Sequence, residues 1–437
     1  MEHLSKRGQL LAKNPSRVDL AMFAKANENL FDPSKNPAGA FPLNVAENVI
    51  MGGRIREQFQ QYMANNTLPD WISQYTGHLG HPEVRACLAG FMRQYFDSPT
   101  IQADNIAFSA GTSASLEACS FVLANPGDVV VIPAPAYPMY THDLGIKSGM
   151  ERYDLQTHHK IKGQSSLALV NTALLEETLA KLQEANKTFR MLLITSPDNP
   201  SGSVYSQEQL TELAVWCLSK KIHLVVNEIY ALSRIIPEET GRKKQTDACN
   251  QHHSFAGIME RLNSDYLHLV YGLSKDFAIS GLRFGILHSL NSAFIQAIDG
   301  VNIPHMVSNL TQWLVGKLFE DSAFIKAYIE ENQQQISRSY GVVIKGLEQV
   351  GIPYIPSKGS LFVWADFSQF LSENSQQGEE DLWIRIFEQT GVLLTPGSGF
   401  GHRKKGLFRL VHTAVPISHL ETAMERLLAF LGSLAVK

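Results

Sequence analysis

The sequence lacks the features that mark several large classes of protein. No two of its four cysteines form a Cys-x-x-Cys pair, so neither a zinc ribbon nor a dithiol redox motif is available. No run of 18 apolar residues occurs, which argues against a transmembrane helix. No histidines have metal-ligand spacing, and we predict no metal site. Residues 1–6 lack the apolar stretch of a signal peptide, which predicts a cytoplasmic protein.

An excess of charge of one sign is also missing. The chain has 38 Lys and Arg against 42 Asp and Glu, a formal net charge of −4. A nucleic-acid-binding protein would show clustered excess base, so we predict no nucleic-acid partner, and we predict no membrane partner either. Hydrophobic residues make up 44% and charged residues 18%, which is typical of a folded globular protein. The 437 residues are enough for about two or three domains.

The sequence does contain a repeated succession of strand and helix patterns. Short apolar runs typical of buried strands occur at residues 128–132, 191–195, 222–226, 267–271 and 284–287. Helical patterns lie between them, as at 207–220, where Leu210, Leu213 and Cys217 share one face. This alternation predicts an α/β fold whose large domain has a mostly parallel, doubly wound sheet.

A change of pattern near residues 300–310 predicts a domain boundary. A long helical stretch at 308–348 leads into further strands and helices at 361–367, 381–389, 392–395, 407–411 and from 417 onward. Residues 1–40 are polar and contain a short helix followed by an arm. We therefore predict a large domain at 49–305. The arm at 1–48 and the C-terminal part at 306–437 are predicted to form a smaller α/β domain.

The loops that follow the predicted strands carry polar side chains, at the place where ligands of such sheets bind. Lys275 comes directly after a buried strand, where a charged amine is costly and a deprotonated amine suits Schiff-base formation with an aldehyde. Arg283 is a candidate for holding an anion, and Gly111 and Thr112 open a helix whose N-terminus suits phosphate. An aldehyde and a phosphate together indicate pyridoxal 5′-phosphate (PLP).

The chain as a whole resembles a known family. It is similar to the fold-type I, class I/II PLP-dependent aminotransferases, and most of all to their 1-aminocyclopropane-1-carboxylate (ACC) synthase-like branch. The resemblance covers residues 43–413 and rests on motifs in the family's order and spacing. These are NVAEN at 44–48, YTG at 75–77, HPEVR at 81–85, AGT at 110–112, PAPAYP at 133–138, NPSG at 199–202, NEIY at 227–230, SKD at 274–276, GLRFG at 281–285 and FR at 408–409.

The resemblance implies how the cofactor is held. Lys275 would form the Schiff base and move the substrate proton, and Tyr137 would stack on the pyridine ring. Asn199 and Tyr230 would donate to the phenolic oxygen of the cofactor. The predicted cofactor-binding residues also include Gly111, Thr112, Ser274, Arg283 and Asn227, together with Tyr75, which would reach the phosphate of the partner subunit. Such sharing implies a homodimer.

The resemblance also implies how small-molecule substrates, an α-amino acid and a 2-oxo acid, are held. Arg409 would grip the α-carboxylate through a bidentate pair, together with Asn199. Ala46 and Glu47 would line the substrate pocket. Catalysis is assigned to Lys275, together with Tyr230 and Asn227.

Two residues depart from the family pattern. Asn227 stands where the family has an aspartate, whose charge keeps the pyridine nitrogen protonated. Glu228 is adjacent, but on a strand its side chain should point the other way. Gly272 stands where the family usually offers a serine hydroxyl to the phosphate. We therefore expect cofactor binding, with a slower reaction than is usual in the family.

Three hypotheses follow for the function. The first is an aminotransferase. The second is an ACC-synthase-like lyase that eliminates a γ-substituent from a compound such as S-adenosylmethionine. The third is a protein of this fold with weak or no turnover, for which Asn227 is the positive argument.

Overall fold

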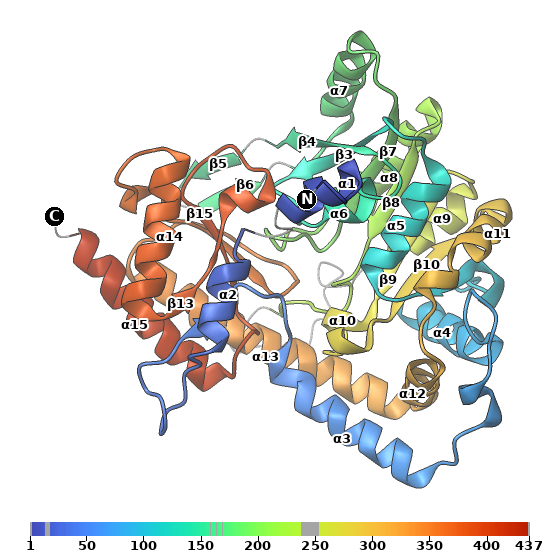
Figure 1. The fold of residues 1–437 in the computed structure, drawn as a ribbon, viewed down its shortest axis with the longest axis horizontal. Helices are drawn as coiled ribbons and strands as arrows, with labels where there is room; N and C mark the ends of the chain where they lie inside the picture. The colour runs from blue at the N-terminus through green and yellow to red at the C-terminus, as the bar shows by residue number, and fades with distance from the viewer. Residues whose placement is uncertain are drawn as a thin grey trace.

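A computed structural model describes residues 2–13, 18–157, 159–162, 164–167, 169–236 and 253–435. Within these ranges a large sheet carries helices on both faces, and a smaller sheet lies beside it (Figure 1). The large sheet has the strand order β2-β10-β9-β8-β7-β3-β4. Its strands are β2 (Ile106–Ser109), β3 (Val129–Ala134), β4 (Glu151–Gln156), β7 (Phe189–Thr195), β8 (His223–Asn227), β9 (Leu267–Gly272) and β10 (Gly285–Ser289).

All neighbouring strands of the large sheet are parallel except at β10, which runs antiparallel to both β9 and β2. Successive residues of β7 belong to different cores, because side chains alternate across a sheet. Leu192 and Ile194 pack on one face, and Met191 and Leu193 pack on the other. The predicted α/β fold with a mostly parallel, doubly wound sheet is confirmed.

Different sets of helices cover the two faces. The Leu192 face packs against α3 (Val49–Asn65), α4 (Pro82–Tyr95), α7 (Thr172–Glu184), α8 (Gln207–Lys220), α9 (Phe255–Leu262) and α12 (Asn309–Glu320). The Met191 face packs against α5 (Thr112–Leu123), α6 (Tyr140–Gly145) and α11 (Ser292–Val301).

A smaller domain joins the N-terminal arm to the C-terminal part of the chain, as predicted. Its antiparallel sheet has the order β11-β12-β15-β14, with β11 (Tyr354–Ile355), β12 (Phe362–Asp366), β14 (Thr395–Pro396) and β15 (Leu407–Val411). From the arm, β1 (Phe41–Pro42) pairs in parallel with β13 (Val392–Leu393). The helices are α2 (Leu20–Asn27), α14 (Gln376–Thr390) and α15 (Ile417–Ala435). Ala26 and Phe41 of the arm are buried in the same core as Val363 and Leu410.

The helix α13 (Ser322–Gln349) connects the two domains. Its first half, including Phe324 and Ile329, packs in the large core, whereas Val343 and Leu347 pack in the small core. The helical stretch predicted at 308–348 is divided into two helices, because Asp321 caps α13 by accepting a hydrogen bond from the Phe324 amide at 3.0 Å. The boundary drawn at residue 305 stays a prediction.

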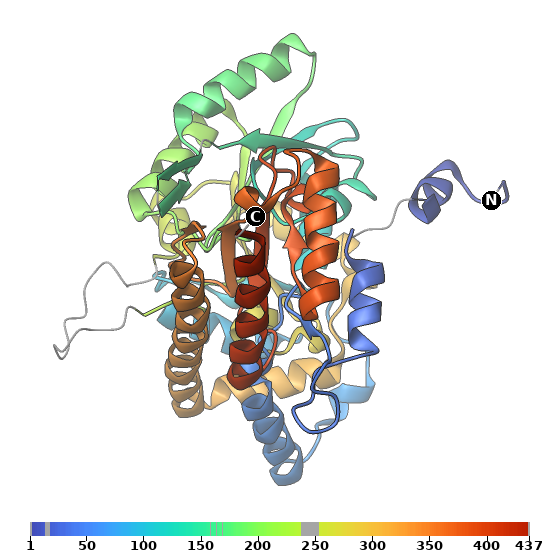
Figure 2. The same ribbon diagram turned by 90° about the vertical axis from the view of Figure 1, so that its left-hand side faces the viewer.

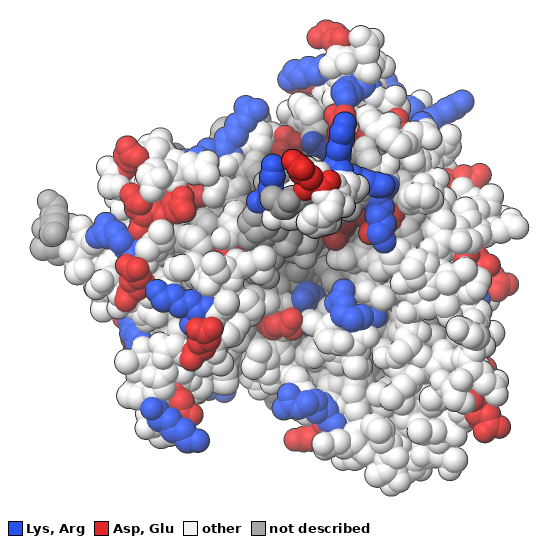
Figure 3. Space-filling view, viewed as in Figure 1, with Lys and Arg blue, Asp and Glu red and all other residues white. Residues whose placement is uncertain are grey.

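The remaining elements lie at the periphery or at the site described below. The helix α1 (Lys6–Lys13) has no buried residue and stands away from the body of the molecule (Figure 2). The others are the hairpin of β5 (His159–Lys162) and β6 (Gln164–Leu167), and the short helix α10 (Leu273–Asp276). None of the described helices is long and apolar enough to span a membrane. Acidic and basic side chains are interspersed on the face in Figure 3.

Candidate active site

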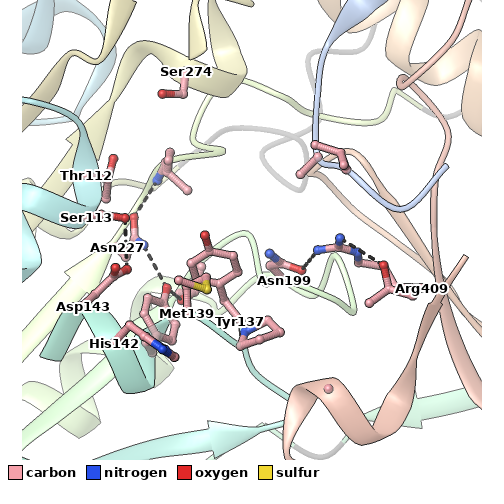
Figure 4. A pocket seen from close by; sticks show the side chains of 18 of the residues that line it. Thr112, Ser113, Tyr137, Met139, His142, Asp143, Asn199, Asn227, Ser274 and Arg409 are labelled. Carbon is pink, nitrogen blue, oxygen red and sulfur yellow. Dashed lines mark hydrogen bonds between the residues drawn. The ribbon is translucent and has the colours of Figure 1, made fainter. Parts of the chain in front are cut away.

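A cavity of about 430 Å³ opens at the carboxyl ends of the central parallel strands. It is lined from one side by the large domain and from the other by the arm and the small domain (Figure 4). The predicted site residues in its wall are Ala46, Thr112, Tyr137, Asn199, Asn227, Tyr230, Ser274, Lys275, Arg283 and Arg409. The fold therefore brings together residues that lie as far apart in sequence as Ala46 and Arg409.

Lys275 lies on α10, which directly follows β9. Its Nζ donates a hydrogen bond to the Ala46 carbonyl oxygen at 2.6 Å. Burial lowers the pKa of Lys275 to about 8; the charge of Glu47 opposes this shift, and those of Arg409 and Arg283 add to it. At neutral pH a larger share of this amine is therefore neutral than in an ordinary lysine. The neutral amine is the form that attacks an aldehyde.

The N-terminus of α5 and Arg283 lie at one end of the cavity, in an arrangement suited to an anion. Gly111 precedes the helix with a φ of 91°, and a Cβ there would lie 2.2 Å from Nη2 of Arg283, so this close approach requires glycine. Arg283 Nη1 donates to the Ser280 carbonyl oxygen at 3.0 Å, which orients the guanidinium. Thr112 Oγ1 is buried and has no hydrogen-bond partner among the described residues. An anion here meets a guanidinium, a helix N-terminus and a hydroxyl.

The space beside Gly272 is filled by the hydroxyl of Thr112, the first residue of α5. A Cβ on Gly272 would lie 2.4 Å from Thr112 Oγ1. The threonine side chain therefore fills the space that a side chain at residue 272 would need. The Thr112 hydroxyl from α5 therefore lies directly beside the position at which the sequence lacks a hydroxyl on β9.

The cavity wall next to Tyr137 contains a group of hydrogen-bonded polar side chains. Asn227 ends β8, and its Nδ2 donates to Tyr140 Oη at 2.9 Å, while its Oδ1 accepts from the Ile229 amide at 3.2 Å. Tyr140 Oη lies 2.6 Å from Thr195 Oγ1. The rings of Tyr137 and Tyr140 meet edge to face, with centroids 5.2 Å apart. Desolvation raises the pKa of Tyr140, so its hydroxyl keeps its proton.

Glu228 points away from the cavity, as its strand position predicts. Its carboxylate accepts hydrogen bonds from Ser254 Oγ at 2.7 Å and from the Phe255 amide at 2.6 Å, on the opposite side of β8. Its charge therefore does not replace that of the aspartate missing at Asn227.

Arg409 lies on β15 and reaches the cavity from the small domain. Its Nη1 donates to Asn199 Oδ1 at 2.9 Å, and its Nη2 donates to the Asn44 carbonyl oxygen at 2.6 Å. The guanidinium carbon lies 4.8 Å from the ring centroid of Phe362 and 5.0 Å from that of Phe400. The two rings and the two acceptors fix the plane of the guanidinium, as bidentate binding of a carboxylate requires.

Three predicted site residues are not in the cavity wall. Gly111 lies directly behind Arg283, and the Glu47 carboxylate acts on Lys275 through its charge. Tyr75 is fully exposed to solvent and is absent from the wall. Its predicted role in a partner's site stays a prediction.

Several wall residues were not found from the sequence, among them Val18, Asp19, Ser113, Met139, Tyr140, His142, Asp143, Thr195, Thr395 and Ser398. Asp143 is a partly buried acid that accepts from Ser113 Oγ at 3.1 Å. Burial raises its pKa to about 7. Tyr140 and Asp143 follow Tyr137 at three-residue steps, and this spacing is the signal that could have indicated both.

These residues fit PLP. Arg283, the start of α5 and the unpartnered Thr112 hydroxyl suit its phosphate, and Lys275 suits its aldehyde. Tyr137 offers an aromatic ring in the same wall.

Comparison with known proteins gives the same family. The family model described as aminotransferase class I and II matches residues 43–427. 1-Aminocyclopropane-1-carboxylate synthase 6 of Arabidopsis thaliana is 29% identical over 93% of this chain and 81% of that protein. A Mus musculus protein named "Probable inactive 1-aminocyclopropane-1-carboxylate synthase-like protein 2" is 29% identical over 97% of this chain and 71% of its own length.

Solved structures share the fold. The aspartate aminotransferase of Thermus thermophilus, in a double-mutant form, matches with a TM-score of 0.75 at 22% identity, covering 98% of this chain and 100% of that one. An aromatic aminotransferase from Pyrococcus horikoshii OT3 matches with a TM-score of 0.75 at 20% identity, covering 95% and 100%. At these identities the likeness concerns the fold alone.

Proposed function

The chain belongs to the aminotransferase class I and II family, and from this premise we propose that it is an enzyme transferring an amino group between an α-amino acid and a 2-oxo acid. Its cofactor is pyridoxal 5′-phosphate, the cofactor of that family. One observation carries the proposal: the amine of Lys275 and the guanidinium of Arg409 open onto the same cavity. An α-amino acid held there has its carboxylate at Arg409 and its α-carbon toward Lys275.

In this proposal each residue has a definite task. PLP supplies an electron-withdrawing ring that weakens the bonds at the α-carbon of the amino acid. Lys275 would hold the aldehyde of the cofactor through its amine, and with an amino acid bound it would take the α-proton on Nζ and return it. Arg283 and Thr112 hold the phosphate, with Gly111 and Ser274 beside them, and Tyr137 covers the ring.

The other end of the cofactor and the substrate are held by residues from both domains. Asn199 and Tyr230 bind the phenolic oxygen, and Asn199 is already joined to Arg409 by a hydrogen bond. Burial raises the pKa of Tyr230 well above its usual value, so its hydroxyl remains a donor. Ala46 and Glu47 border the substrate next to Lys275.

A lyase of the ACC synthase type is the second candidate, because the curated relatives quoted above carry that name at 29% identity. It would use the same cavity and the same lysine, and would release a γ-substituent instead of transferring nitrogen. Weak or absent turnover is the third candidate, and the replacement of aspartate by Asn227 supports it.

We also propose a homodimer with shared active sites, in which Tyr75 reaches the partner's phosphate. The complete exposure of Tyr75 in the single chain supports this role. Measurement of the molar mass in solution, together with PLP affinity in Tyr75→Phe, tests the proposal. The proposal would be contradicted if the protein were monomeric in solution and its PLP affinity were unchanged by Tyr75→Phe.

The enzymatic proposal is tested by the visible spectrum of the purified protein with PLP. We expect a band that borohydride reduction fixes to the protein, lost in Lys275→Ala and kept in Lys317→Ala, a lysine on α12 outside the cavity. A panel of amino acids with a 2-oxo acid should then yield a new amino acid. Release of methylthioadenosine from S-adenosylmethionine would favour the lyase, and no response to any substrate would favour the third candidate.

A further inference from the structure

The orientation of the Asn227 amide is determined by its neighbours. The Ile229 amide can only donate a hydrogen bond, and it lies 3.2 Å from Asn227 Oδ1. A reversed amide would bring the NH₂ group against this N–H, so that two donors would face each other. The side-chain oxygen of Asn227 is therefore held toward the backbone, and its nitrogen toward Tyr140.

The hydrogen bonds beyond the amide follow from this orientation. Because Nδ2 is a donor, Tyr140 Oη accepts from it at 2.9 Å. Tyr140 Oη also lies 2.6 Å from Thr195 Oγ1, and either hydroxyl can be the donor in that pair. One hydrogen of Nδ2 is used in this way, and no residue in the described ranges accepts the other. Asn227 is also part of the cavity wall, so this second N–H is a donor available to a bound group (Figure 4).

We propose that Asn227 presents an N–H donor to the ring nitrogen of PLP and so holds that nitrogen in its unprotonated state. A pyridine nitrogen can accept a hydrogen bond only when it carries no proton, and a donor facing it penalises protonation. This inference rests on the proposed function, since it takes PLP to lie in the cavity with its ring nitrogen at Asn227.

With its nitrogen unprotonated, the cofactor ring withdraws electron density less strongly than a ring that a carboxylate keeps protonated. An aspartate at this position would accept hydrogen bonds from both Ile229 and Tyr140, and it would add a charge that stabilises the ring proton. The hydrogen bonds around residue 227 can thus accommodate either side chain, because the Tyr140 hydroxyl can donate or accept. The single change Asn227→Asp should therefore change the ring nitrogen from its unprotonated to its protonated state.

The test uses the PLP-loaded protein with ¹⁵N in the pyridine ring, observed by solid-state NMR. We expect the ring ¹⁵N resonance at the position of an unprotonated pyridine throughout pH 6 to 9. In Asn227→Asp it should move to the position of a protonated pyridine over that pH range. Asn66→Asp makes the same chemical change at an exposed position outside the cavity wall, and it should leave the resonance unprotonated.

A protonated ring nitrogen in the unchanged protein would overturn the inference, and this measurement decides the matter even if Asn227→Asp does not fold. A ring that stays unprotonated in a folded, PLP-loaded Asn227→Asp would overturn it as well. Failure of PLP to attach to Lys275 is a separate result, seen in the visible spectrum. It would refute the proposed function and this inference with it.

Discussion

Replacing Arg409 with lysine should weaken the binding of amino acids to the PLP-loaded protein. The guanidinium lies against the rings of Phe362 and Phe400 and is hydrogen-bonded to Asn199 and to the Asn44 carbonyl oxygen. Lysine keeps the positive charge and loses the two-pronged geometry, so one charge-assisted hydrogen bond to the carboxylate disappears. Such a bond contributes about 1.5–3 kcal/mol, which corresponds to roughly a 10- to 100-fold increase in Kd.

The assay is a titration of the visible spectrum with amino acids, which reports binding even without turnover. A matched control is Arg385→Lys, since Arg385 also lies over an aromatic ring, 5.9 Å from the centroid of Phe430, but outside the cavity wall. The control should keep the original Kd. The phosphate end is unchanged in both variants, so the affinity for PLP itself should stay the same.

A second comparison tests whether Arg409 acts on the α-carboxylate of the bound amino acid. An amine that lacks the α-carboxyl group should bind the original protein and Arg409→Lys with equal affinity. The reasoning would be refuted if the variant bound amino acids normally, or if the loss were equally large for the amine. Either result would mean that Arg409 serves the packing between the domains and does not bind substrate.

Other residues give further predictions. Arg283→Gln should raise the Kd of PLP about 10- to 100-fold by removing a charged phosphate contact, measured by equilibrium titration, while pyridoxal without phosphate should bind both proteins alike. Gly272→Ser should not strengthen phosphate binding; because its Cβ would meet Thr112 Oγ1 at 2.4 Å, thermal unfolding should show a loss of about 1–3 kcal/mol. Lys275, with its pKa lowered to about 8, releases its proton more easily in the folded protein, so the unfolded chain binds more protons between about pH 8 and 10.5. PLP-free protein should therefore gain stability with rising pH over that window relative to Lys275→Met in urea titrations, and equal pH dependence would contradict the burial of the amine.

The sequence was sufficient to predict five strands of the large sheet because each of these patterns was local, whereas the edge strands β2 and β4 were missed. The apolar run at 191–195 lies within β7, and the helix predicted at 207–220 has the observed bounds of α8. The division at Asp321 was missed because a capping carboxylate resembles any other polar residue within a long amphipathic pattern.

The site was predicted through motifs, and the wall residues outside those motifs were not. Lys275 and Arg283 lie at a fixed spacing on one segment, whereas Asp19 enters the cavity from a distant part of the arm. Nothing local in the sequence indicates that contact. The close approach of the Thr112 hydroxyl to Gly272 is likewise visible only in three dimensions, because it depends on the distance between β9 and α5. The roles of the individual site residues stay predictions.

The edge position of β2 determines the order in which the phosphate end can be completed during protein synthesis. β2 has one neighbour in the sheet, β10, and residues 110–284 are made between them. When β9 leaves the ribosome, the parallel strands β3, β4, β7 and β8 have already been made. At that point β2 still lacks β10, the strand with which it pairs. The nascent chain therefore carries the apolar strand β2 as an unpaired edge for most of the large domain's translation, and α5 and Arg283 reach their final arrangement only after β10 has emerged.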